Sequence, residues 1–148
     1  MEKPSEFEPD VVTPAHGTFM QVPTLTAGDA VDVAILGVPY DIATHPHRVG
    51  SRLGPDHIRT QSAQTRRFLS DREGDPFGTL RVADAGNVAV VPGRAVEAYA
   101  SIESAVRTIL STGAAPLTFG GDGAVTLPQL RAVAATHSDV AVVHVDAH

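Results

Sequence analysis

The sequence predicts an α/β protein with a doubly wound parallel sheet, in which helices cover both faces as a three-layer αβα arrangement. Short apolar runs of strand length alternate along the chain with longer segments of helical periodicity. The strand segments are apolar along their length, which is typical of parallel strands buried on both faces. Because strand and helix alternate, successive strands are expected to lie parallel and to be joined by right-handed crossovers.

The first strand and helix of this pattern have clear boundaries. Residues 31–38 form an apolar run that ends at a proline, and a polar loop over 40–53 follows it. A helix is expected to begin around Pro55, because proline suits the first helical position and Asp56 suits the positive end of the helix dipole. This helix is expected to run to about Leu69.

The remaining elements continue the alternation. The best helical signal covers residues 95–111, where apolar side chains recur every three or four residues and Gly113 can cap the end. No helix follows the last expected strand in this sequence, so the sheet is expected to be incomplete at the C-terminus. The expected elements are a loop over 70–79, a strand over 80–84, the helix over 95–111, a strand over 115–119, a helix marked by 127–133 and a strand over 140–145.

Two regions are expected: an irregular N-terminal arm over residues 1–30, and an α/β domain over 31–148. Four prolines within the arm break both helix and strand. Small apolar clusters at residues 19–25 allow the arm to dock on the core or on a neighbouring subunit.

Composition excludes several classes of protein. With 148 residues, 43% of them hydrophobic and 19% charged, the chain suits one globular domain. Its net charge of −6 disfavours a nucleic-acid or anionic-membrane partner, which would require a basic face. The chain has no cysteine, no signal peptide and no apolar run near the ~18 residues of a membrane span. A cytoplasmic protein with no membrane partner is therefore expected.

Three loops that follow strand segments hold the candidate functional residues, because open α/β sheets bind ligands at the C-terminal ends of their strands. The loops cover residues 37–55, 119–124 and 146–148. In the last of them, Asp146 and His148 offer a carboxylate and an imidazole two residues apart, and both are ligands of divalent metals. The alternative is a solvated chain end.

The glycine-rich segment at residues 120–123 has two interpretations. It suits a tight strand-to-helix turn that needs positive φ angles, with Asp122 as a hydrogen-bonding residue of the turn. It could also form a phosphate-binding nest, but its spacing matches neither a P-loop nor a dinucleotide fingerprint. The turn is the preferred interpretation.

The other charged side chains have simpler expected roles. Arg48 and Arg52 are expected to orient the loop after the first strand or to pair with a neighbouring subunit. A solvated helix face is expected for Arg66 and Arg67. The two histidines of the first loop could contact substrate but are expected to face solvent, and the others are expected at the surface: His45 and His47, then His16, His57 and His137.

Five segments of the chain carry recognisable motifs: TFMQVP at 18–23, GVPYD at 37–41 with GSRLGP at 50–55 and Ile58-Arg59, DAGNV at 84–88, FGGD at 119–122 and HVDAH at 144–148. Together they resemble the motifs of the ureohydrolase family, the arginase and agmatinase superfamily, and the arm and first loop favour its agmatinase-like branch. The family usually has Asp at the position of Asn87.

The resemblance implies a reaction, a cofactor and an assembly. Family members hydrolyse a guanidino group to urea and an amine, using a hydroxide that bridges two Mn²⁺ ions, because metal binding lowers the pKa of water. Agmatine or a guanidino acid is the implied substrate, and a homo-oligomer, a trimer or hexamer, the implied assembly. By the same resemblance Asp146 matches a metal-bridging carboxylate, and His148 an imidazole ligand of one metal.

Departures from the family pattern leave two functions open. Gly123 stands where the family has a ligand His, and Ala124 where it has Ser. The further ligand Asp two residues beyond His148, and a later pair of aspartates, are not in this sequence. The chain is therefore either the incomplete N-terminal part of an agmatinase-like enzyme, or a pseudoenzyme or regulatory subunit that keeps the arm and the oligomer surface. An unrelated small-molecule-binding α/β module is a third, weaker interpretation.

Overall fold

The sheet has four strands in the order β1-β3-β2-β4, in a computed structural model that describes residues 12–13, 15, 17–42, 49–68 and 74–146. Strand β2 lies between β3 and β4 and is parallel to both, whereas β1 is antiparallel to β3. The strands are β1 (Val12–Thr13), β2 (Val33–Gly37), β3 (Val82–Val88) and β4 (Ala115–Phe119). The predicted parallel sheet is confirmed.

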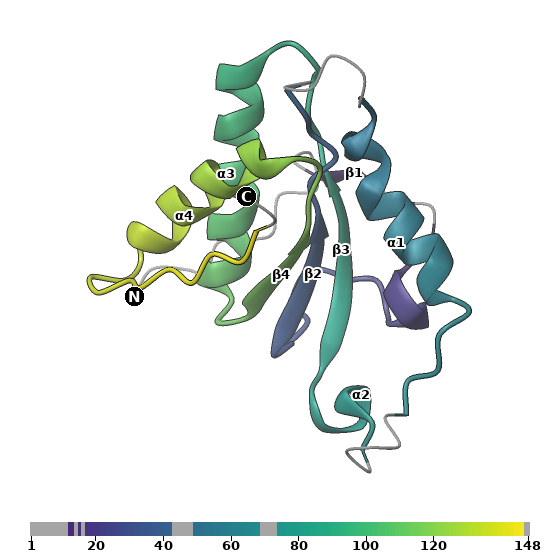
Figure 1. Ribbon diagram of the computed structural model, residues 1–148. Helices are drawn as coiled ribbons and strands as arrows, with labels where there is room; N and C mark the ends of the chain where they lie inside the picture. Colours follow the sequence, from purple (N-terminus) through teal and green to yellow (C-terminus); the bar gives the residue numbers. More distant parts are fainter. Residues whose placement is uncertain (1–11, 14, 16, 43–48, 69–73, 147–148) are drawn as a thin grey trace.

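Helices lie on both faces of this sheet, as expected for a doubly wound fold. Figure 1 shows α1 on one face, and α3 and α4 on the other. The main core lies on the side of α3, where side chains such as Leu36, Val88 and Ile102 pack together. The helices are α1 (Gly54–Ser62), the short α2 (Pro76–Thr79), α3 (Ala95–Ser111) and α4 (Thr126–Ala134).

Helix α3 and strand β4 have the bounds that the sequence predicts. The buried face of α3 carries Ala98, Ile102, Ala105, Val106 and Ile109. Its C-terminal end is closed by Gly113, which has a φ of 84° and donates its N–H to the carbonyl of Leu110. Both elements have strong local signals, which explains the agreement.

Helix α1 and strand β3 differ from their predicted bounds. Helix α1 ends at Ser62 and not near Leu69, because the Ser62 hydroxyl donates to the Arg59 carbonyl and accepts from the arm. Strand β3 runs to Val88, although its second half has the composition of a turn. Within the expected loop over 70–79, α2 begins after Asp75, whose carboxylate accepts the Phe77 N–H.

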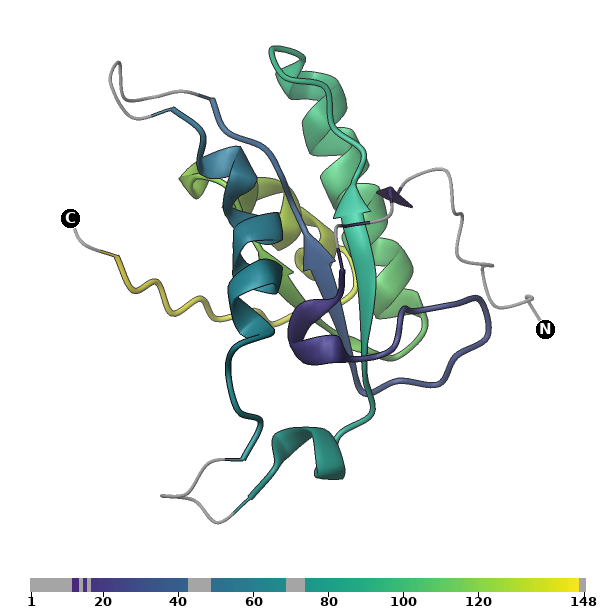
Figure 2. The same ribbon diagram turned by 90° about the vertical axis from the view of Figure 1, so that its right-hand side faces the viewer.

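The predicted strand over 140–145 is wrong for this structure. The segment pairs with no strand among the described residues, and Val143 and Val145 are 91% and 90% exposed. A parallel strand needs apolar packing on both faces as well as a neighbour, and neither face of this segment is packed. In Figure 2 it runs as an extended chain away from the sheet, so β4 is an edge strand.

The arm docks on the core of its own chain. Val22 is buried, and the carbonyl of Pro23 and the N–H of Leu25 both pair with the backbone of Asp84 in β3. The docked part of the arm includes a 3₁₀ turn (Phe19–Gln21). The sequence allows residues 19–25 to dock either on the core of their own chain or on a neighbouring subunit. In this structure they dock on the core of their own chain.

The turn of the arm holds two consecutive non-glycine residues in the left-handed region: Met20 with a φ of 47° and Gln21 with a φ of 58°. Because this conformation costs about 1–2 kcal/mol for a residue with a Cβ atom, and Gln21 is exposed, we expect Gln21→Gly to raise the free energy of unfolding by about 1 kcal/mol. Urea denaturation measures this. Gln61→Gly, in helix α1, is the control and should lower the free energy of unfolding. If both variants are less stable than the parent chain, the left-handed conformation of Gln21 does not strain the folded state.

Candidate functional site

The loops that follow β2 and β4 are joined into one structure at the C-terminal edge of the sheet. The carboxylate of Asp122 accepts the N–H of Ile42 at 2.9 Å and the N–H of Ala124 at 3.0 Å. In return, the N–H of Asp122 donates to the carbonyl of Tyr40 at 3.3 Å. Asp122 is therefore a hydrogen-bonding residue of the turn, as the sequence predicts, and it also links two loops.

None of the glycines of this turn is needed for a positive φ angle, so that part of the prediction is wrong; close contacts require Gly120 and Gly121. None of the three has a positive φ. A Cβ atom on Gly121 would lie 1.9 Å from the Tyr40 carbonyl oxygen, and one on Gly120 would lie 2.8 Å from Val125. A Cβ atom on Gly123 would meet nothing within 4 Å. Position 123 therefore has room for a larger side chain.

Asp41 and Arg52 stabilise the loop after β2. The Arg52 guanidinium contacts both oxygens of the buried Asp41 carboxylate, at 2.5 Å in its shortest contact, and the Arg52 N–H adds a bond of 2.9 Å. The side-chain and backbone hydrogen bonds from Arg52 lower the pKa of Asp41 to about 2. Arg52 therefore orients this loop, as predicted; Arg48 lies outside the described residues.

This ion pair is expected to make the folded state sensitive to acid. The pKa of Asp41 is lowered from 3.8 to about 2, so its contribution to stability is complete above about pH 4 and is lost as the pH falls through about 2. Arg52→Met should return the pKa toward 3.8 and remove that part of the acid dependence. Urea denaturation from about pH 5 to about pH 2 measures it, with Arg107→Met, which breaks an exposed pair with Glu103, as control. An unchanged pH profile in Arg52→Met would contradict the assignment.

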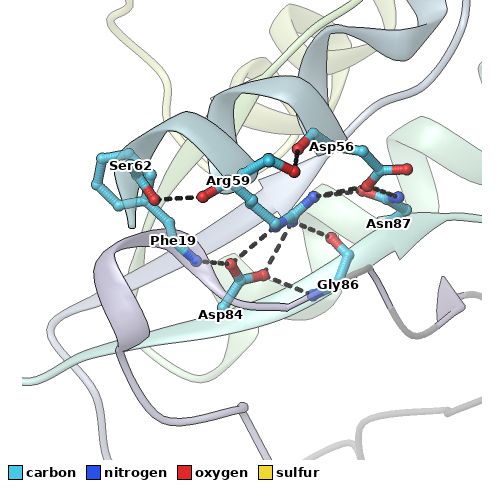
Figure 3. A network of polar contacts seen from close by, with 8 residues as sticks. Phe19, Asp56, Arg59, Ser62, Asp84, Gly86 and Asn87 are labelled. Atoms are coloured by element: carbon cyan, nitrogen blue, oxygen red, sulfur yellow. Dashed lines mark hydrogen bonds and ion pairs between the residues drawn. The ribbon is translucent and has the colours of Figure 1, made fainter. Parts of the chain in front are cut away.

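A buried ion pair between Arg59 and Asp84 lies on the α1 side of the sheet (Figure 3). The two side chains are 0% and 1% exposed. Arg59 donates from Nε and Nη2 to the two carboxylate oxygens, both at 2.9 Å, and Nη2 also donates to the Gly86 carbonyl at 2.9 Å. Sequence reasoning places both residues in family motifs but does not pair them, because they come from a helix and a strand.

The amide of Asn87 extends this network toward the end of β2. Its oxygen accepts from Nη1 of Arg59 at 2.7 Å, and its nitrogen donates to Asp56 at 2.9 Å. An ionised Asp at this position could accept from Arg59 but could not donate to Asp56, because a carboxylate has no donor when ionised. Gly37 makes room for it, because a Cβ atom there would lie 1.8 Å from the Asn87 oxygen.

The described residues do not form a binuclear metal site. No group of three or more His, Asp or Glu side chains suited to one ion occurs within them. Asp146 is partly exposed and its carboxylate lies 3.4 Å from Nε2 of His144; His148 lies outside the described residues. Gly123, at the end of the turn, contributes no donor.

The remaining charged residues are distributed as follows. His57 and His137 are exposed, as predicted, whereas His16, His45 and His47 lie outside the described residues. The expected helix face for Arg66 and Arg67 is wrong, because α1 ends before them. Instead, the Arg67 guanidinium donates to the carbonyl of Met20 and lies 5.1 Å from the Phe77 ring centre.

No helix in the described part of the chain is long and apolar enough to cross a membrane.

Fold and loops together define a doubly wound α/β protein whose candidate site lies at the C-terminal edge of its strands. The sequence model of the Arginase family matches residues 31–148, and the chain belongs to that family. Its relatives include a mitochondrial agmatinase from Gallus gallus, 39% identical over 131 residues, and a guanidinobutyrase from Pseudomonas aeruginosa, 43% identical over 134 residues. Each alignment covers 88% of this chain.

The same relationship holds for solved structures. The proclavaminate amidino hydrolase from Streptomyces clavuligerus superposes with a TM-score of 0.81 and 36% identity, over 89% of this chain and 44% of that chain. The two sequence alignments cover 38% of the agmatinase and 42% of the guanidinobutyrase. The chain thus corresponds to the N-terminal part of an agmatinase-like protein and spans about two fifths of the length of these curated relatives.

Proposed function

We propose that the chain is the N-terminal part of an amidinohydrolase that converts a small guanidino compound, agmatine or a guanidino acid, to urea and an amine. The observation that carries the proposal is the linked pair of strand-end loops, in which Asp122 holds the glycine-rich turn against the loop after β2. Relatives with agmatinase and guanidinobutyrase activity in their names support the substrate class. We further propose a cytoplasmic homo-oligomer.

The charges at this edge of the sheet suit a cationic substrate. A guanidinium group is repelled by free arginine side chains, but Arg52 is bound by Asp41 and Arg59 is buried against Asp84. Two positive charges near the loops are thus each paired with a carboxylate. The local field is therefore less repulsive to a guanidinium than the sequence alone suggests.

Manganese is the metal that we propose for the complete site, with Asp146 and His148 as two of its ligands. Two ligands cannot hold two ions, since each ion needs about four to six donors. We therefore expect the 148-residue chain to bind Mn²⁺ weakly and to release no urea at a useful rate.

Gly123 favours a second candidate function, that of a pseudoenzyme or regulatory subunit of the same family. The position is internal and has no side chain to offer a metal. The open space around it means that packing does not require a glycine there. A protein that has lost a ligand at this position could still keep its arm, its fold and its assembly surface.

The test combines metal analysis with assays of urea release from agmatine and 4-guanidinobutyrate. After dialysis the chain should retain less than one Mn²⁺, and two tightly bound ions would contradict the proposal. Gly123→His should raise Mn²⁺ affinity by at least ~10-fold, whereas Gly123→Gln, of similar size, should not. If a longer protein that continues this reading frame releases urea, the result supports the enzyme. If that longer protein binds Mn²⁺ and releases urea only when it carries Gly123→His, the result supports the pseudoenzyme.

A further inference from the structure

We propose that the N-terminal arm positions the glycine-rich turn by clamping Phe119, the last residue of β4. The Phe119 ring lies close to a ring of the arm and to a guanidinium of helix α1. The ring of Phe19, in the arm, lies with its centre 5.0 Å from the centre of Phe119 and is tilted by 57°. The guanidinium carbon of Arg59 lies 6.0 Å from the same centre. Phe19, Arg59 and Phe119, with the carboxylate of Asp84 that binds the first two, are called the Phe119 clamp below.

One carboxylate holds both contacting residues in place. Oδ2 of Asp84 accepts the backbone N–H of Phe19 at 2.9 Å and Nε of Arg59 at 2.9 Å. Figure 3 shows the two donors converging on this side chain from the arm and from α1. Because Asp84 is buried, these charge-assisted bonds are not weakened by competing water. The arm and the helix therefore share one fixed point on β3.

The arm residue next to Phe19 is anchored separately. The N–H of Met20 donates to the Ser62 hydroxyl at 2.7 Å, and its carbonyl accepts from the Arg67 guanidinium. Met20 is also in the left-handed conformation, which persists only where its surroundings impose it. These bonds come from the last residue of α1 and from the segment that follows it, and they fix the direction in which the arm presents the Phe19 ring.

The residues after Phe119 cannot absorb a displacement of its backbone without disturbing close contacts. The Gly120 carbonyl packs closely against Gly54, because a Cβ atom on Gly54 would lie only 2.9 Å from the Gly120 carbonyl oxygen. The Gly121 backbone packs against the Tyr40 carbonyl, because a Cβ atom on Gly121 would lie 1.9 Å from the carbonyl oxygen of Tyr40. Since close-packed contacts transmit small shifts, movement of Phe119 must reach Asp122 and its link to Ile42. Phe19 and Arg59 are thus positioning residues for the candidate site.

Amide hydrogen exchange in the Phe19→Leu variant tests this clamp. The substitution removes the ring contact but keeps the backbone N–H that binds Asp84. The N–H groups of Ile42, Asp122 and Ala124 donate the hydrogen bonds that hold the turn. We expect hydrogen exchange at these three amides to accelerate by ~10-fold relative to the amides of helix α3. Reference to α3 matters because a purely structural loss of stability would accelerate exchange in both places by the same factor.

Two further variants make the result decisive. Arg67→Met loosens the arm from outside the clamp and should accelerate the same three amides, with a smaller factor. Phe68→Leu, at an exposed phenylalanine near the arm contact, is the matched control and should leave them unchanged. The proposal is overturned if exchange at the turn stays within about twofold of α3 in both Phe19→Leu and Arg67→Met. None of these measurements requires metal or substrate, so they are independent of the proposed reaction.

Discussion

Replacing Asp84 by Ala is expected to lower the free energy of unfolding by about 3–5 kcal/mol, the cost of leaving one member of a buried ion pair without its partner. The Arg59 side chain is 0% exposed, and the ionic contact left to it would be the one of 3.6 Å with the partly exposed Asp56. Asp84 also accepts the N–H groups of Phe19 and Gly86, so its loss would leave two backbone donors unsatisfied. Since a domain of this size is stable by only about 5–15 kcal/mol, the variant should be close to unfolding.

Urea denaturation followed by circular dichroism measures this effect, and failure of the variant to fold counts as the expected outcome. The matched control is Asp32→Ala, which breaks a similar Asp–Arg pair with Arg81 near the start of the strands. Those side chains are 36% and 62% exposed, and such pairs contribute only about 0–1 kcal/mol. Equal losses in the two variants would show that burial does not determine the contribution of Asp84.

Gly121→Ala is expected to cost about 3 kcal/mol, the upper part of the range for overpacked sites. The new Cβ atom would stand 1.9 Å from the Tyr40 carbonyl oxygen, and that atom is backbone and cannot rotate away. The loops after β2 and β4 would have to separate. We therefore expect the bond between the Asp122 N–H and Tyr40 to be lost, together with part of the link to Ile42.

Gly123→Ala, two residues later in the same turn, is the control for Gly121→Ala. It adds the same methyl group into open space and is not in the left-handed region, so stability should change by less than about 0.5 kcal/mol. Thermal or urea denaturation of the two variants side by side gives the comparison. Similar stabilities would mean that the Tyr40 contact is not tight in solution.

Elements with strong local signals could be predicted well. Helix α3 has an apolar face at regular helical spacing and a glycine after its end, and β4 has a short apolar run between turns. Their bounds depend on residues within each element. Helix α1 shows the limit, because it ends where the Ser62 hydroxyl meets the arm, and that contact spans 42 residues of sequence.

The candidate site divides in the same way. The roles of Asp122 and Arg52 could be predicted from the loops that contain them, since both bind neighbours within or beside those loops. The pairing of Arg59 with Asp84 could not, because nothing in the local sequence indicates which helix residue meets which strand residue across the layers. The metal ligand role of Asp146 and His148 stays a prediction.

The class of fold and the family could be read from the amino-acid sequence alone. These depend on periodicity, composition and motifs, which are properties of neighbouring residues. Packing between distant segments makes Gly121 necessary opposite a carbonyl of another loop, leaves Gly123 unconstrained, and lets Asp84 join the arm to Arg59. It also leaves residues 140–145 outside the sheet, although their composition favours a strand. Burial and close approach arise between distant segments, so the physical reasons appear only when the layers are packed together.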